Sequence, residues 1–195
     1  MRWRLFAVLP FAVALPQVAS AAGDPQVLYE SVFDIDGDGV ADRAVLVEFP
    51  DAEFTSLHIY LGSGAAALNL AAKPSFAKTD VIAGTAIGLE LTGKASLAIT
   101  SCFGCGANKS WEETLTIVHR NGTFAVAGFT RSWDWNSHLA DGSVDTQMGG
   151  CDINYLTGKG TVSEGLNAAK PVKRRFNPLT LEDWRAQKLP EICEF

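Results

Sequence analysis

Apolar residues recur along this chain with a period of two after residue 25, which is typical of β-strands rather than of helices. Val45, Val47 and Phe49 alternate with polar or smaller residues in this way. Asn121-Gly122 separates two apolar runs and accepts the positive φ angles of a tight hairpin turn. Strands are expected at the short apolar runs 44–49, 57–61, 95–100, 115–118 and 124–129. The pattern predicts a mainly β fold, as an antiparallel sheet or sandwich-like single domain.

Helical signal is sparse and gathers near the C-terminus. Residues 180–187 begin with Thr180, which can cap a helix, carry two acids in the first turn and are followed by Pro190. They predict one short C-terminal helix. The sequence does not decide between helix and loop for residues 64–72, because their alanine content favours a helix whereas their neighbours favour a loop.

The first 21 residues have the layout of a cleavable signal peptide. Arg2 and Arg4 precede an apolar run over 5–18, and Ala19-Ser20-Ala21 fits a cleavage site. The run is interrupted by prolines and is shorter than the roughly 20 residues of a membrane-spanning helix. We therefore expect residues 1–21 to be removed and residues 22–195 to form one β-rich domain, periplasmic or secreted, without a membrane anchor.

The charge balance argues against nucleic-acid partners. The full chain has a formal net charge of −6, and loss of Arg2 and Arg4 with the signal peptide makes it −8. Such a chain is repelled by phosphate backbones and by anionic lipid surfaces. The basic run 170–175 is short and is interpreted as a solvated turn.

Four cysteines in an exported chain predict two disulfides. Three pairings are possible. We favour Cys102–Cys105 with Cys151–Cys193, because the second bond would anchor a C-terminal tail that has little else to hold it. A redox Cys-x-x-Cys site is less favoured, since it needs a helix N-terminus, and a zinc site is less favoured because Cys151 and Cys193 have no close second cysteine.

The segment 34–42 carries the clearest candidate chemistry. Aspartates occupy loop positions 1, 3, 5 and 9, and glycine occupies position 6. Calcium takes six to eight oxygen ligands, and carboxylates at alternate positions of a tight loop can face one ion. The position that holds a bidentate glutamate in an EF-hand is Val45 here, and the flanks are strand-like. The pattern predicts a structural calcium site, against the alternative of a solvated Asp/Gly turn.

Residues 28–49 resemble the calcium loop and hairpin of FG-GAP and VCBS-type repeats, whose pattern is Asp-x-Asp-x-Asp-Gly-x-x-Asp followed by a strand. The resemblance implies a Ca²⁺ cofactor bound by these side chains and one backbone carbonyl: Asp34, Asp36, Asp38, Asp42 and the carbonyl of Val40. The chain holds one full copy of the unit, so a propeller is not supported. The stretch 151–159 is similar, more loosely, to a segment of small secreted bacterial proteins of unassigned function.

No catalytic set is recognisable in the sequence. Glu112 and Glu113 are adjacent, so in a strand they face opposite sides and cannot jointly flank a glycosidic bond. Trp133 and Trp135 would share one face of a strand and offer a platform for a sugar or peptide, against the alternative that they are core residues.

These observations predict a calcium-stabilised, non-catalytic binding domain. Its partner would be an envelope or extracellular protein or a glycan. Two alternatives remain open: a hydrolase of cell-envelope polymer, marked by a cleft of clustered acids and tryptophans, and an inhibitor of a secreted enzyme, marked by one protruding loop.

Overall fold

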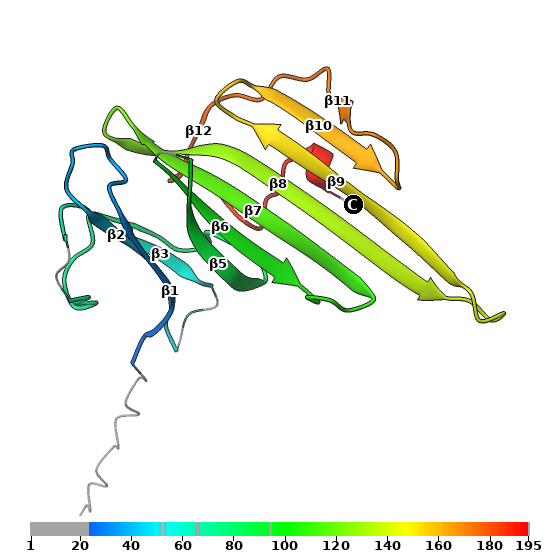
Figure 1. The fold of residues 1–195 in the computed structure, drawn as a ribbon, viewed down its shortest axis with the longest axis horizontal. Coiled ribbons are helices and arrows are strands. Elements are labelled where there is room, and N and C mark those ends of the chain that lie inside the picture. The colour runs from blue at the N-terminus through cyan, green and yellow to red at the C-terminus, as the bar shows by residue number, and fades with distance from the viewer. Residues whose placement is uncertain (1–23, 51, 53, 65–66, 94, 195) are drawn as a thin grey trace, which may run out of the picture.

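The computed structural model describes residues 24–194 except 51, 53, 65–66 and 94, so the expected signal peptide lies outside the described residues. The chain is mainly β and forms two antiparallel sheets, as predicted (Figure 1). The smaller sheet has the order β1-β2-β3-β4 and the larger β11-β10-β9-β8-β7-β6-β5, with β12 also paired to β8. The strands are β1 (Gln26–Phe33), β2 (Asp42–Glu48), β3 (Ser56–Tyr60), β4 (Phe76–Lys78), β5 (Thr85–Thr92), β6 (Ser96–Phe103), β7 (Lys109–Arg120), β8 (Thr123–His138), β9 (Val144–Asn154), β10 (Lys159–Glu164), β11 (Lys170–Pro171) and β12 (Leu179–Thr180).

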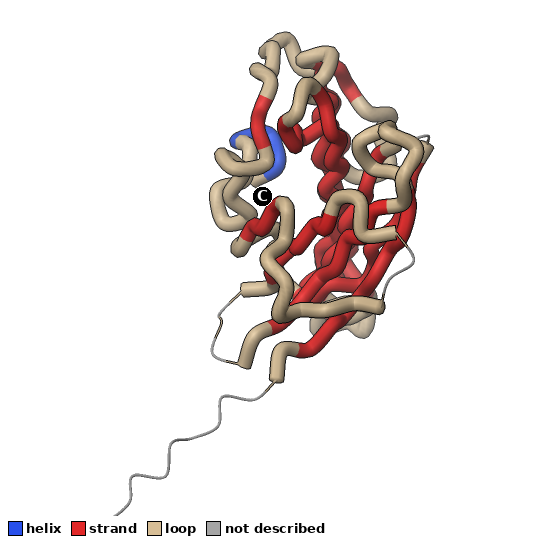
Figure 2. The backbone as a smooth tube through the Cα atoms, turned by 90° about the vertical axis from the view of Figure 1, so that its left-hand side faces the viewer, coloured by secondary structure: helices blue, strands red, loops and turns tan. Residues whose placement is uncertain are grey.

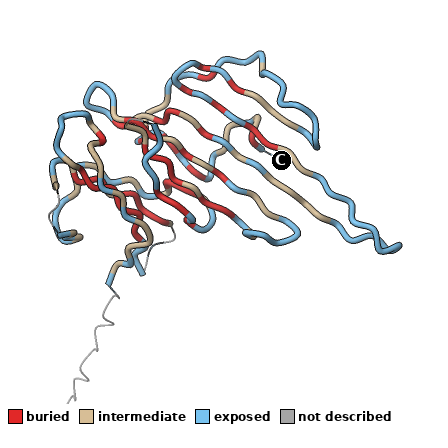
Figure 3. The backbone as a smooth tube through the Cα atoms, in the orientation of Figure 1, coloured by how far each residue is buried: buried red, intermediate tan, exposed pale blue. Residues whose placement is uncertain are grey.

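One hydrophobic core joins the two sheets. Leu46 and Leu57 of the smaller sheet belong to the same buried cluster as Ile99, Ile117 and Phe129 of the larger sheet. Burying the apolar face of each sheet against the other is the main stabilising contribution expected of such an arrangement. Figure 3 shows buried residues concentrated where β1–β3 adjoin β5–β8, whereas the ends of β7–β9 that run away from the smaller sheet are intermediate or exposed.

Strand β2 is buried on both faces. Its Val45 and Val47 pack with Tyr60 in a second, smaller cluster, against which Leu68 and Leu70 lie. The alternation seen in the sequence therefore marks this smaller cluster, while Leu46 points to the main core. The described part of 64–72 contains turns but no helix, because its leucines are used to cover this second face.

The hairpin predicted at Asn121-Gly122 is confirmed. The two residues have φ angles of 51° and 74°, and they join β7 to β8 with Arg120 paired to Thr123. Both angles are positive, as a two-residue turn of this kind requires.

A short helical element lies near the C-terminus, but not at the predicted residues. The 3₁₀-helix is η1 (Glu191–Cys193), whereas 180–187 contain the end of β12 followed by turns. The capping prediction holds locally, since Thr180 Oγ1 accepts a hydrogen bond from the Asp183 amide at 3.2 Å. Residues 181–183 form a turn rather than a helix, and Leu181 and Trp184 are both buried in the core.

The C-terminal segment crosses one side of the larger sheet (Figure 2). Trp184 Nε1 donates to the carbonyl of Val81 at 2.9 Å, and the Phe176 amide donates to the carbonyl of Gly158 at 3.0 Å. The described residues contain no helix long and apolar enough to span a membrane.

Candidate functional site

The acidic segment forms the loop of the β1–β2 hairpin, in which Phe33 pairs with Asp42. Gly37 and Gly39 have φ angles of 84° and 87°, in the left-handed region that a side chain disfavours. These two glycines let the backbone fold tightly around the aspartate at the start of the loop.

Asp34 organises the loop. Its carboxylate accepts hydrogen bonds from the amides of Gly37 at 2.7 Å, Asp38 at 3.1 Å and Gly39 at 2.9 Å. Asp38 in turn accepts from the Val40 amide at 2.7 Å. The loop amides therefore point inward at carboxylate oxygens, which holds the acidic side chains together.

Asp42 is the buried member of the set, with 1% of its surface exposed. One carboxylate oxygen accepts from the Ile35 amide at 2.8 Å and the other from the Gly62 amide at 2.7 Å. Asp42 thus ties the loop to the turn that follows β3, and its position does not depend on flexible surface contacts.

Three of the predicted ligands come together. Carboxylate oxygens of Asp34, Asp36 and Asp42 lie within 4.8 Å of one another. Oxygens that share a calcium ion at about 2.3–2.6 Å are at most about 5 Å apart, so this set fits a single ion. The Asp38 carboxylate does not belong to this convergent group of side chains, and Asp38 and Val40 are both exposed. A hard oxygen donor set of this kind suits calcium better than a soft or redox-active metal.

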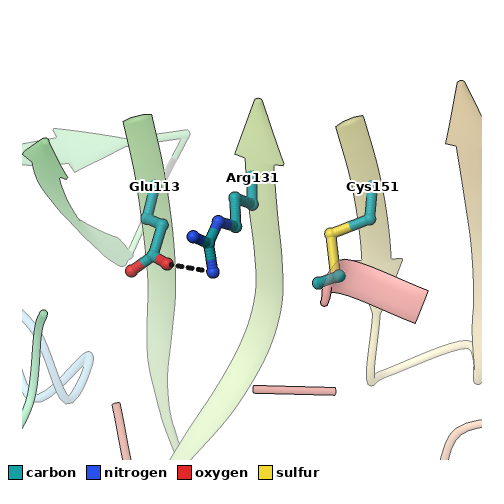
Figure 4. Close-up of polar contacts among 4 residues, drawn as sticks. Glu113, Arg131 and Cys151 are labelled. Atoms are coloured by element: carbon teal, nitrogen blue, oxygen red, sulfur yellow. Dashed lines mark ion pairs between the residues drawn. A yellow bond between two sulfur atoms is a disulfide. The ribbon is translucent and has the colours of Figure 1, made fainter. Parts of the chain in front are cut away.

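Both preferred disulfides are confirmed. Cys102 is bonded to Cys105, and Cys151 on β9 is bonded to Cys193 in η1 (Figure 4). No described cysteine is free. Two disulfides indicate an oxidising environment of the kind found outside the cytoplasm.

We define the inner face of the larger sheet as the face that carries Ile99, Leu115, Phe129 and Ile153. Along the strands, the side chains on this face change from apolar to charged and then to aromatic. Cross-strand register places its residues in rows. Beyond the apolar row come three further rows: Ser101, Glu113, Arg131 and Cys151; then Phe103, Trp111, Trp133 and Gly149; then Lys109, Trp135 and Gln147.

Glu113 is a buried acid that sequence reasoning did not single out as a site. Its Oε1 lies 3.3 Å from Arg131 Nη1 (Figure 4), and 4% of the residue is exposed. Burial raises the pKa of Glu113 to about 7, and Arg131 opposes part of this rise. The signal was present in the sequence, because Trp111, Glu113 and Leu115 alternate onto one face. Glu112 is exposed on the other face, so the two glutamates lie on opposite sides of the sheet, as expected.

Trp133 and Trp135 lie on the same face, with ring centroids 5.0 Å apart and planes inclined at 50°. Both are half-buried. Phe103 stacks on Trp111 at 6.0 Å, and the Arg131 guanidinium lies 4.9 Å from the Trp111 ring centre. The aromatic side chains thus extend from the margin of the core toward the uncovered end of the sheet.

Comparison with protein-family models, curated proteins and solved structures found no match to this chain. The fold and site define a disulfide-bonded, mainly β protein with a convergent carboxylate loop.

Proposed function

We propose that this chain is an exported, calcium-stabilised binding domain without catalytic activity, acting in the periplasm or outside the cell. The observation that carries the proposal is the convergence of the Asp34, Asp36 and Asp42 carboxylates within 4.8 Å. Three carboxylates at this separation repel one another unless a cation lies between them. The FG-GAP and VCBS-type resemblance of residues 28–49 supports calcium as that cation.

The oxidising environment indicated by the two disulfides supports export, with residues 1–21 as the signal peptide. The distribution of acids supports binding over hydrolysis. Glu113 is the buried glutamate on the inner face, and its partner there is Arg131 rather than a second carboxylate. A glycosidase of the usual kind needs two carboxyl groups about 5–9.5 Å apart across the scissile bond.

Calcium titration tests the proposal. We expect calorimetry on the chelator-treated protein to show a heat of binding. At a calcium concentration one hundred times Kd, the free energy of unfolding should rise by about 2.7 kcal/mol. For a chain of this size that corresponds to a rise in Tm of about 5–10 °C. Absence of both the heat and the shift would remove the calcium site.

Asp36→Asn locates the ion. Asp36 contributes a convergent oxygen, and its Oδ1 accepts a hydrogen bond from the Asp38 amide at 3.1 Å, an acceptor role that an asparagine oxygen can retain. We expect the variant to keep the calcium-free stability and to lose most of the calcium response. Asp141→Asn is the matched control, since it also lies in an exposed Asp-Gly turn, and its response should equal that of the wild type.

A second candidate, inhibition of a secreted enzyme, is favoured by the β8–β9 hairpin. Figure 1 shows this hairpin running past the ends of β7 and β10. Its tip, residues 139–143, is exposed and is closed by a hydrogen bond from the Leu139 amide to the Ser143 carbonyl at 2.9 Å. Asp141 accepts from the Ser143 amide and hydroxyl at 2.9 and 2.6 Å, which lowers the pKa of Asp141 and stiffens the tip.

A pull-down from envelope extract separates this candidate from the first. Leu139 is 49% exposed at the tip, so Leu139→Asp changes the contact surface without touching the core. If the hairpin inserts into an enzyme, the wild type should retain a hydrolase and Leu139→Asp should lose it, with or without chelator. Equal recovery of any protein by both would exclude the hairpin as the inhibitory element.

A further inference from the structure

We propose that the uncovered end of the inner face binds an extended, uncharged polysaccharide chain, an inference that rests on the proposed binding function and gives it a ligand class. The surface, called here the tryptophan surface, consists of aromatic and polar side chains from β6–β9. Its members are Phe103, Lys109, Trp111, Trp133, Trp135, Ser137, Asp145 and Gln147.

The rings are held against the sheet by glycines. A Cβ atom on Gly149 would lie 2.9 Å from ring atoms of Trp133, so the indole occupies the space above that glycine. A Cβ on Gly84 would likewise lie 2.8 Å from the Trp111 ring. These close approaches fix the rings in place before any ligand arrives, which reduces the entropy lost on binding.

The rings are also partly open to solvent. Trp111, Trp133 and Trp135 are half-buried, and Phe103 is 59% exposed. They extend across three neighbouring strands, which are spaced about 4.8 Å apart. An aromatic surface of this length suits an elongated ligand that lays an apolar face over several rings in succession.

Hydrogen-bonding side chains border the rings. Gln147 pairs with Trp135 across β8 and β9, and its Nε2 donates to Asp145 Oδ2 at 3.3 Å. Lys109 Nζ lies 5.8 Å from the Trp135 ring centre, and Ser137 pairs with Asp145. The aromatic faces can contact the apolar C–H face of a sugar ring. The neighbouring amide, carboxylate, hydroxyl and ammonium groups can form hydrogen bonds with the sugar hydroxyl groups.

The charge balance of the tryptophan surface favours an uncharged sugar as its ligand. Lys109 and Asp145 have opposite signs, and Arg131 at the inner margin lies 3.3 Å from the Glu113 carboxyl group. The tryptophan surface therefore has no excess charge to attract a polyanion, and the chain as a whole is acidic. A neutral polysaccharide meets no electrostatic penalty, whereas an anionic polymer is repelled.

Binding of hexasaccharides tests the inference. The calcium-loaded protein is titrated with cello-, chito-, xylo- and mannohexaose, with heparin as the anionic comparison, and binding is followed by calorimetry and tryptophan emission. We expect at least one neutral hexasaccharide to bind and to shift the emission, and heparin to be without effect. Trp135→Ala and Gln147→Ala should each weaken binding tenfold or more.

Phe49→Ala is the matched control, because Phe49 is a partly exposed aromatic residue next to the smaller sheet. It should bind as the wild type does. Because Gln147 is exposed and outside the core, Gln147→Ala should fold normally, so weaker binding by this variant reports a lost contact rather than misfolding. The inference is overturned if none of the four neutral hexasaccharides binds at millimolar concentration, if heparin binds more tightly, or if both variants bind like the wild type.

The outcome is independent of the calcium proposal. Calcium binding without any sugar binding would remove the tryptophan surface as a glycan site and leave the calcium-stabilised domain intact. Sugar binding by a protein that shows no calcium response would support the tryptophan surface as a glycan site and remove the calcium site.

Discussion

Replacing Cys151 and Cys193 by alanine is expected to lower the free energy of unfolding by about 4 kcal/mol. The bond closes a loop with a sequence separation of 42 residues, and the chain-entropy relation gives this magnitude for such a loop. The C-terminal tail that precedes η1 has little backbone pairing, since β11 and β12 have two residues each. Chemical denaturation of the oxidised wild type and the double variant measures the loss.

The same variant should loosen the tail before the rest of the protein. Trp184 is 3% exposed and packs on Phe129 with ring centroids 5.1 Å apart, so its emission reports on the tail. We expect a red shift at denaturant concentrations below the main transition. Cys102 and Cys105 provide the comparison, because their separation is 3 residues and the same relation gives only about 1.6 kcal/mol. Equal losses from both double variants would contradict the anchoring role.

Replacing Glu113 by glutamine is expected to remove a pH-dependent loss of stability of about 3 kcal/mol. Burial raises the pKa of Glu113 from 4.5 to about 7 in the folded chain. A carboxyl with a raised folded pKa contributes stability that is fully present below about pH 4.5 and is lost as the pH rises through about 7. The 2.5-unit difference between these two pKa values corresponds to about 3 kcal/mol.

Denaturant unfolding between pH 4.5 and 9 in saturating calcium measures this effect. Relative to Glu113→Gln, the wild type should lose stability as the pH rises, because the variant stays uncharged throughout. Arg131 faces Glu113 from β8, and Ser101 faces it from β6 with a buried hydroxyl that has no hydrogen-bond partner among the described residues. Glu112→Gln changes the exposed neighbour and should follow the wild-type curve. A difference between wild type and Glu113→Gln that does not vary with pH would contradict the prediction.

Local sequence was sufficient where the decisive interactions are local. Asn121-Gly122 marks its hairpin because two successive residues must adopt positive φ angles, which few pairs do readily. The aspartate loop is predictable for the same reason, since Asp34 bonds to amides only three to five residues away. The calcium that would occupy it remains a prediction from the resemblance and from the donor set.

The misplaced C-terminal helix shows where local signal is insufficient. Residues 180–187 carry a capping threonine and early acids, yet Leu179 and Thr180 pair with β8 instead, and Trp184 reaches Val81. Burial of two large side chains and pairing with a central strand outweigh a capping preference of about 1 kcal/mol. Strand β8 and Val81 are both distant in sequence from residues 180–187, so the local sequence gives no sign of these contacts.

By itself, the sequence determined the β period, the hairpin turn, the cysteine set and the acidic loop, because each depends on residues close together in the chain. Only the tertiary structure decided that Asp42 is held by Gly62, that Glu113 lies buried beside Arg131, and that Trp133 and Trp135 lie in register with Gly149 and Gln147. Those relations arise from strand register, and register is selected by the burial of whole faces rather than by any short segment.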